Sequence, residues 1–466
     1  MTRRGNAMAG NFGFGPGNPG NPGDPEDSDN SANSNFNELF QQFSQFNIPG
    51  FAFNPQSLFT QPVAGAPLIN RETIRDLARK FITAQSELPV GNVDQSQIQE
   101  ALDIANTWLD EGTTFPALTR GVHPAWNRRD WVDASLDGWQ KLVEPLAEGM
   151  ANALTDVIAQ SGAEGNPAVE AIGGEAALGA ITPIMRNFMG QLIASQLGNS
   201  VGQLATTVTG SNDVAIPLFG LSTRNSSESA HPTALNTGVC EPHLIPQNIL
   251  AWAQGLEIPI EEVRIYLALR ESAAARLFSH TPWLSEYIYS LVQDYGKGIR
   301  IDIQAIQEQA EGAMNSGELD ISNPQSISIA INQGMFTPEQ TPKQEAALAK
   351  LEMALALIEG WIDHTTTLVG ENRLPAFASL NEMLRRRRAT AAPTQQLFST
   401  LVGLQVSPRK FRECSTFWSE VEKIAGLEGR DGRWEHEGLL PSSEEISDPA
   451  GFIASTTVPD DLSGLI

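Results

Sequence analysis

Apolar residues recur every three or four positions along most of the chain after residue 70. This spacing gathers them on one face of an α-helix. It is clearest in five segments: 95–110, 131–146, 166–208, 260–279 and 342–369. Signals of a β-strand are sparse, and DVAIPLFG over 213–220 is the best of them. The pattern predicts a fold that is mainly α.

The residues at the ends of these segments support the helical prediction. Asn70 is a good N-cap for NRETIRDLARKFITA, because its side chain can accept from free N–H groups of the first turn. Pro282 predicts a break after the 260–279 helix, with a further helix to about Tyr295. The polar stretch 221–243 predicts a surface loop.

The two ends of the chain differ from its middle. Residues 1–35 consist mainly of Gly, Asn, Pro, Asp and Ser, which predicts a disordered tail. Residues 36–69 form a linker, in which NELFQQFSQF (37–46) predicts a short amphipathic docking helix. A helical domain over 70–455 and a C-terminal tail over 456–466 complete the predicted organisation.

Composition narrows the possible partners and compartment. The net charge of −25 disfavours nucleic acid and anionic membranes as partners. The two cysteines, Cys240 and Cys414, lie far apart without CxxC spacing, so neither a disulfide framework nor a cysteine zinc site is predicted. No apolar run is long enough to cross a membrane, and no apolar segment follows the twin arginine near the N-terminus. We therefore expect a cytoplasmic protein.

The segment LALRESAAARLFSH (267–280) raises the question of a metal site. In the zinc motif His-Glu-x-x-His, two imidazoles four residues apart lie on one helix face and hold the metal, while the glutamate polarises a bound water. Here Arg270, Glu271 and Ala274 stand at the His, Glu and His positions. The spacing is retained and the ligands are not, and the pentapeptide alone is typical of an ordinary helix rather than of a zinc site.

Arg270 lies in the middle of the apolar stripe of its helix, where a charged side chain needs an acidic partner. A matching carboxylate occurs in LALIEGWIDH (355–364), because Glu359 lies within the apolar stripe of that helix. Asp363 follows one turn later, at the edge of the stripe. We predict that Glu359, together with Asp363, accepts hydrogen bonds from Arg270.

The remaining histidines and the basic run offer little further chemistry. No two of the six histidines are three or four residues apart, so they form no ready metal pair. His280 is a weak candidate ligand, and His364 points away from the Glu359 side of its helix. The run RRRR (385–388) predicts a helix end paired with carboxylates rather than a nucleic-acid site.

Four segments together resemble the zincin-like metallopeptidase family 2 of actinobacteria, whose members are named as hydrolases or zinc-dependent metalloproteases. They are WNRRDWVDASLDGWQKLVEPLA (126–147), GLEIPIEEVRIYLALRESAAARLFSHTPWL (255–284), TPKQEAALAKLEMALALIEGWIDH (341–364) and LRRRRATAAPTQQLFSTLVGLQVSPRKFRE (384–413). The resemblance extends from about residue 70 to about residue 455.

The resemblance implies a zincin-like helical domain and a role for each motif position. Glu271 matches the general base, Glu359 matches an acidic third zinc ligand, and Asp363 matches a carboxylate behind it. Arg270 and Ala274 replace the two histidine ligands, so the motif is degenerate.

Two functions therefore remain open. The first is a family member without catalytic zinc or any other cofactor, a pseudoenzyme that binds a protein or peptide partner. The second is an active zinc-dependent hydrolase with a non-standard ligand set, in which His280 or His243 joins Glu359. The sequence names neither a substrate nor a partner.

Overall fold

The computed structural model describes residues 67–118, 124–163, 174–219, 240–300, 341–391 and 410–456, together with residues 395 and 398. Helices dominate these residues, and the only β contacts among them are two isolated bridges. The prediction of a mainly α fold is confirmed. The predicted N-terminal tail, the 37–46 helix and residues 457–466 lie outside the described residues.

Eleven α-helices are described. They are α3 (Arg71–Ala84), α4 (Asn92–Leu109), α5 (Arg128–Ala163), α7 (Gly174–Ala205), α8 (Pro246–Ala253), α9 (Ile260–His280), α10 (Trp283–Lys297), α13 (Pro342–Gly370), α14 (Phe377–Ala391), α16 (Phe411–Asp431) and α17 (Pro449–Thr456). Three short 3₁₀ turns connect α16 to α17 (Gly432–Trp434, Glu437–Leu439 and Glu445–Ser447). No described helix has the length and hydropathy that a membrane crossing needs.

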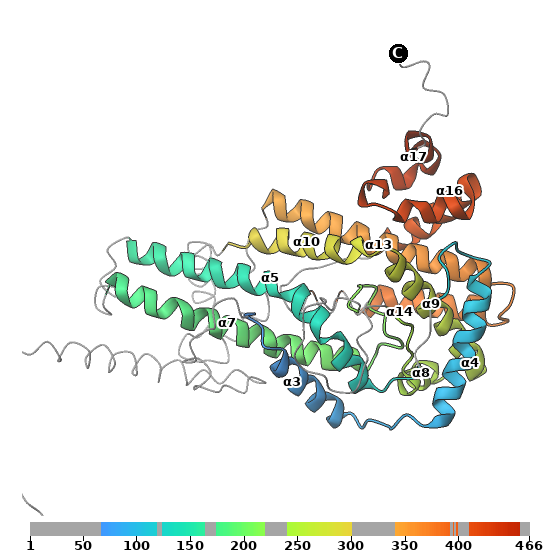
Figure 1. Ribbon diagram of the computed structural model, residues 1–466, viewed down its shortest axis with the longest axis horizontal. Helices are drawn as coiled ribbons and strands as arrows, with labels where there is room; N and C mark the ends of the chain where they lie inside the picture. The colour runs from blue at the N-terminus through green and yellow to red at the C-terminus, as the bar shows by residue number, and fades with distance from the viewer. Residues whose placement is uncertain are drawn as a thin grey trace, which may run out of the picture.

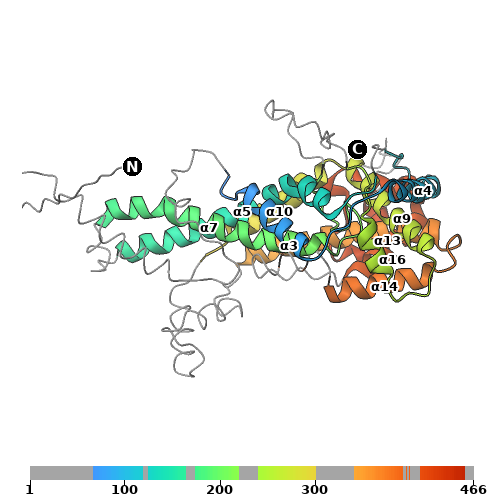
Figure 2. The ribbon, with the colours of Figure 1, turned by 90° about the horizontal axis from the view of Figure 1, so that it is seen from below.

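The helices form an elongated body with one long arm. The helices α5 and α7 lie side by side and extend well beyond the other elements, and α3 packs against them near the body (Figures 1 and 2). At the other end, α4, α8 and α14 gather around α9, which itself packs on α13 (Figure 1). The middle of the chain is thus a packed junction in which α9 contacts α4, α13, α8 and α14.

Local sequence signals set the helix ends as predicted. The Asn70 side chain accepts from the backbone N–H groups of Glu72 at 2.8 Å and Thr73 at 3.3 Å. Thr341 and Gln344 form a capping box at the start of α13, where Pro342 takes the first helical position. Pro282 separates α9 from α10, because a proline ring is incompatible with a continuing helix.

The helix α9 is the centre of the junction. An exposed helix buries one stripe, but α9 buries every side chain from Tyr266 to Phe278. That span includes three charged residues, Arg270, Glu271 and Arg276, and each of them must find partners inside the protein. The partners of Arg270 and Glu271 define the candidate site.

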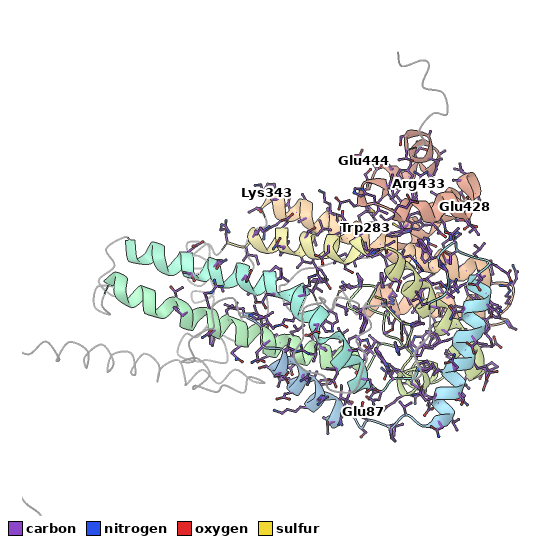
Figure 3. All side chains as sticks on the ribbon, in the orientation of Figure 1. Glu87, Trp283, Lys343, Glu428, Arg433 and Glu444 are labelled. Atoms are coloured by element: carbon purple, nitrogen blue, oxygen red, sulfur yellow. The ribbon has the colours of Figure 1, made fainter. Side chains whose placement is uncertain are left out.

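A second buried layer joins the C-terminal helices to the junction. The helix α16 crosses α13 closely at Gly360, where a Cβ atom would lie 2.7 Å from the Cβ of Cys414. Trp283, labelled in Figure 3, donates from its indole N–H to the Trp434 carbonyl at 2.8 Å and links α10 to this C-terminal region. The C-terminal helices therefore pack on the body directly.

One prediction for the middle of the chain was wrong, and another lies mostly outside the described residues. The 213–219 segment is a buried series of turns and bends rather than a strand, and Ala215 has a φ of 58°. Its apolar residues Val214, Ala215, Ile216 and Leu218 are all buried in the helical protein, so a short apolar run of this kind arises here without strand pairing. Of the predicted 221–243 surface loop, only 240–243 is described, and there Cys240 and His243 are buried.

Candidate functional site

Arg270 and Glu359 form a buried ion pair between α9 and α13. The Arg270 Nη2 atom lies 2.7 Å from Glu359 Oε2, and the two side chains are 8% and 12% exposed. Asp363, one turn after Glu359, places its Oδ1 atom 3.8 Å from Arg270 Nη1. The predicted hydrogen bond from Arg270 to Glu359 is confirmed. Asp363 lies within ion-pair distance of Arg270 but accepts no hydrogen bond from it, so that part of the prediction was wrong.

Two arginines of the basic run complete this arrangement. Arg388 of α14 lies 3.1 Å from Glu359 and 2.7 Å from Asp213, a residue in the buried turns after α7. Arg385 lies 2.7 Å from Asp363, whose Oδ2 atom also accepts from the Ser415 hydroxyl at 2.8 Å. We call these six charged residues the ion-pair cluster: Arg270, Arg385, Arg388, Asp213, Glu359 and Asp363.

The ion-pair cluster is balanced in charge, with three guanidinium groups and three carboxylates. Burial alone would lower the pKa of Arg270, but the negative groups around it, Glu359 foremost, raise that pKa above its ordinary value. Arg270 is therefore a permanent cation in this position.

The basic run lies at the end of α14, as predicted, but among the carboxylate partners that the described residues provide, only that of Arg386 is local, as was expected of the whole run. Arg386 pairs with Glu382 at 2.8 Å on the surface of the same helix, and Arg387 covers the ring of Trp252 at 4.8 Å. Arg385 and Arg388 reach carboxylates on other elements. The run is a helix end engaged with acidic and aromatic partners of this chain.

Glu271 faces a different part of the protein from Arg270. Its carboxylate accepts hydrogen bonds from the Ser211 hydroxyl, from the backbone N–H of Asn212 at 3.0 Å and from the Asn212 amide at 2.7 Å. The backbone N–H of His243 is a fourth, longer donor at 3.4 Å. Glu271 therefore fastens the turn after α7 to α9.

Gly210 makes this contact possible. A Cβ atom at this residue would lie 2.3 Å from Glu271 Oε2, so any other residue would displace the carboxylate. The Glu271 carboxylate is thus covered on one side by the Gly210 backbone. Its other neighbours, Ser211 and Asn212, donate hydrogen bonds to it. This environment leaves Glu271 oriented toward a turn of the protein rather than toward the ion-pair cluster.

Burial raises the pKa of Glu271 to about 7, because desolvation of the carboxylate outweighs the hydrogen bonds from Ser211 and Asn212 that lower it. Asp213, a further negative group in the same turn, adds to the increase.

This pKa predicts a pH-dependent stability. The ordinary glutamate value is 4.5, so between about pH 4.5 and 7 the folded protein binds a proton at Glu271 that the unfolded chain has lost. The free energy of unfolding should therefore fall as pH rises through this window, by up to about 3 kcal/mol at roughly 1.4 kcal/mol per pKa unit. Denaturant unfolding at a series of pH values checks this for the wild type and Glu271→Gln. A Glu271→Gln profile as steep as that of the wild type would contradict it.

The other predicted positions contribute no metal ligands to this site. Ala274, at the second histidine position, is buried and has no donor atom. His280 is exposed at the end of α9, where its ring stacks on Phe115 and its Nε2 atom lies 3.2 Å from the Pro116 carbonyl oxygen. The proposed use of His280 beside Glu359 has no support in this geometry, because ten residues of helix separate it from Arg270 by about 15 Å.

His243 and His364 are also engaged elsewhere. The His243 ring stacks on Trp126 with their centroids 3.7 Å apart, and its Nδ1 atom lies 3.0 Å from the Glu241 carbonyl oxygen. Burial lowers the pKa of His243 to about 4. The His364 Nε2 atom lies 2.7 Å from Glu422, on the side of α13 that faces α16.

A catalytic zinc ion does not fit these residues. Such a site needs three protein ligands around an open position, and no group of three His, Cys, Asp or Glu side chains in the described part of the chain is arranged to hold a metal ion. Glu359 and Asp363 face a guanidinium, and Arg388 and Arg385 bind their other oxygens. A dication would have to enter among three fixed positive charges.

The sequence predicted that Arg270, Glu359 and Asp363 lie together. It did not indicate that Asp213 or the hydrogen-bond donors of Glu271 belong to the site. Asp213 lies 146 residues before Glu359, and its only visible signal was membership of an apolar stretch. Ser211 and Asn212 belong to the polar TGSND segment, which resembles many surface turns. Nothing in the local pattern connects these residues to α9.

Comparison with known proteins agrees with the resemblance in the sequence. A solved structure of a "putative hydrolase with a novel fold" from Chloroflexus aurantiacus has a TM-score of 0.53 and 19% identity, covering 83% of this chain and 98% of that one. This likeness establishes a shared fold. Among curated proteins no relative matches the chain. The model of the zincin-like metallopeptidase family matches residues 69–453, and the chain therefore belongs to that family.

Proposed function

We propose that this protein is a non-catalytic member of the zincin-like metallopeptidase family that acts by binding a protein or peptide. The observation that carries the proposal is the buried Arg270–Glu359 pair at 2.7 Å. In members with the full motif, both positions would face the metal. Here Arg270 supplies a positive charge of its own, and this charge neutralises Glu359.

The environment of Glu271 supports the same proposal. A general base in a metallopeptidase must reach a metal-bound water. Glu271 instead accepts from Ser211 and Asn212, and Gly210 closes on its Oε2 atom. The carboxylate at the general-base position thus has a structural role, because it holds the turn after α7 against α9. A cytoplasmic location and a partner other than nucleic acid stay predictions from the sequence.

A peptidase assay with a matched variant tests the proposal. We expect the purified full chain to release no fragments from denatured protein or from a mixed peptide library, with or without added zinc. Glu271→Gln should give the same result, because a carboxylate without a metal-bound water has no nucleophile to activate. Hydrolysis by the parent that disappears both in Glu271→Gln and on chelation would establish the active-enzyme alternative.

A further inference from the structure

Glu359 and Asp363 form a cation-binding site whose occupant belongs to the chain itself. The two carboxylates are four residues apart on α13, so they lie on the same side of that helix. Both side chains are buried, and the Arg270 guanidinium from α9 lies against both. We propose that this is a guanidinium site that Arg270 fills as a tethered ligand, and that the site prefers a planar monocation to a metal ion.

The site has hydrogen-bonding capacity that the tethered arginine does not use. Asp363 is anchored through its Oδ2 atom by Arg385 and Ser415. Its Oδ1 atom and the Arg270 Nη1 atom are both buried and lack a hydrogen-bond partner among the described residues, although they lie only 3.8 Å apart. The side chain of Arg270 therefore donates a hydrogen bond to Glu359 but none to Asp363. A free guanidinium ion, without a tether, could hydrogen-bond to both carboxylates.

The surrounding charges explain the preference for a monocation. Arg388 and Arg385 already bind Glu359 and Asp363, so one further positive charge balances the cluster and two would exceed it. Guanidinium is planar and donates along directions that match carboxylate oxygens. Zinc requires nitrogen or sulfur ligands or more carboxylates than are free here. The inference rests on the proposed function only in taking Arg270 to replace the metal.

Chemical rescue of Arg270→Ala tests the proposal. This variant removes the tethered ligand and leaves the two carboxylates facing a vacated space. We expect its melting temperature to fall strongly and to recover by half or more in millimolar guanidinium chloride, where the denaturing effect of the salt is still small. The melting temperature of the wild type should not rise in the same solution. The melting temperature of Arg270→Ala should not recover in equal concentrations of sodium chloride or of urea.

The double variant Arg270→Ala/Glu359→Gln is the matched control, since it lacks one of the two carboxylates that the guanidinium would bind. Its melting temperature should respond to guanidinium much less than that of Arg270→Ala. Equal recovery in both variants, or none in Arg270→Ala, would overturn the proposal. Recovery with zinc but not with guanidinium would also overturn it.

If Arg270→Ala does not fold, its refolding yield with and without guanidinium answers the same question, with an increase expected and no increase contradicting the site. Arg270→Lys keeps the charge and is expected to fold with intermediate stability. If guanidinium fails to rescue Arg270→Ala while the wild type contains no zinc, this inference is overturned and the proposed function stands. If the wild type retains zinc and guanidinium still rescues Arg270→Ala, the proposed function is overturned and the guanidinium site stands.

Discussion

Replacing Arg270 with alanine is expected to lower the free energy of unfolding by about 3–5 kcal/mol, because it leaves the buried carboxylate of Glu359 without its closest cation. Glu359→Ala should lower it by a similar amount, since Arg270 and Arg388 then both lose an acidic partner. The double variant should lose much less than the sum of the two, because neither charge of the pair remains stranded. Denaturant unfolding of all four proteins measures the coupling.

A matched control comes from the same basic run as Arg388. The Arg386 side chain is 77% exposed and pairs with Glu382 on the surface of α14. Arg386→Ala should leave the unfolding midpoint nearly unchanged, because exposed pairs contribute little. Additive effects of Arg270→Ala and Glu359→Ala would contradict a direct buried interaction between the two side chains.

Glu271→Ala is expected to have the second large effect, a loss of about 3 kcal/mol or more at neutral pH. The variant removes the acceptor of the Ser211 hydroxyl and of two Asn212 N–H groups, and each buried donor left unsatisfied costs about 1–3 kcal/mol. The turn after α7 would also lose its link to α9. Thermal and denaturant unfolding check the size of the loss.

Glu271→Gln separates the hydrogen bonds from the charge. The amide oxygen can still accept from Asn212, and the Ser211 hydroxyl can turn to accept from the new NH₂ group. We therefore expect a loss well below that of Glu271→Ala. Equal effects of the two substitutions would contradict a role based on hydrogen bonding.

The helices and the central ion pair could be predicted from the sequence because their signals are local. Asn70 and Pro282 mark helix ends through their own side chains, and an apolar stripe interrupted by one charge identifies a buried position. The match of Arg270 with Glu359 followed from each being a single charge within an apolar face. A buried charge requires a partner, and this requirement connects two distant helices.

The partners that were missed obey no such rule. Asp213 pairs with Arg388 because a turn of irregular backbone brings it beside α14. A short run of apolar residues follows it, as in a buried strand, so its segment was assigned to the wrong structure. Glu271 was interpreted through its motif position, while its actual role depends on Gly210 and Asn212, some 60 residues earlier in the chain. Such contacts are set by tertiary packing.

The metal content of the purified full-length protein tests the central claim most directly. The claim is that the guanidinium of Arg270 stands where related proteins would hold zinc. After dialysis against metal-free buffer, we expect elemental mass spectrometry to find no stoichiometric zinc. Circular dichroism should show that the same sample is folded and mainly helical. Chelators should not change its melting temperature. One zinc ion retained per folded chain would contradict the account.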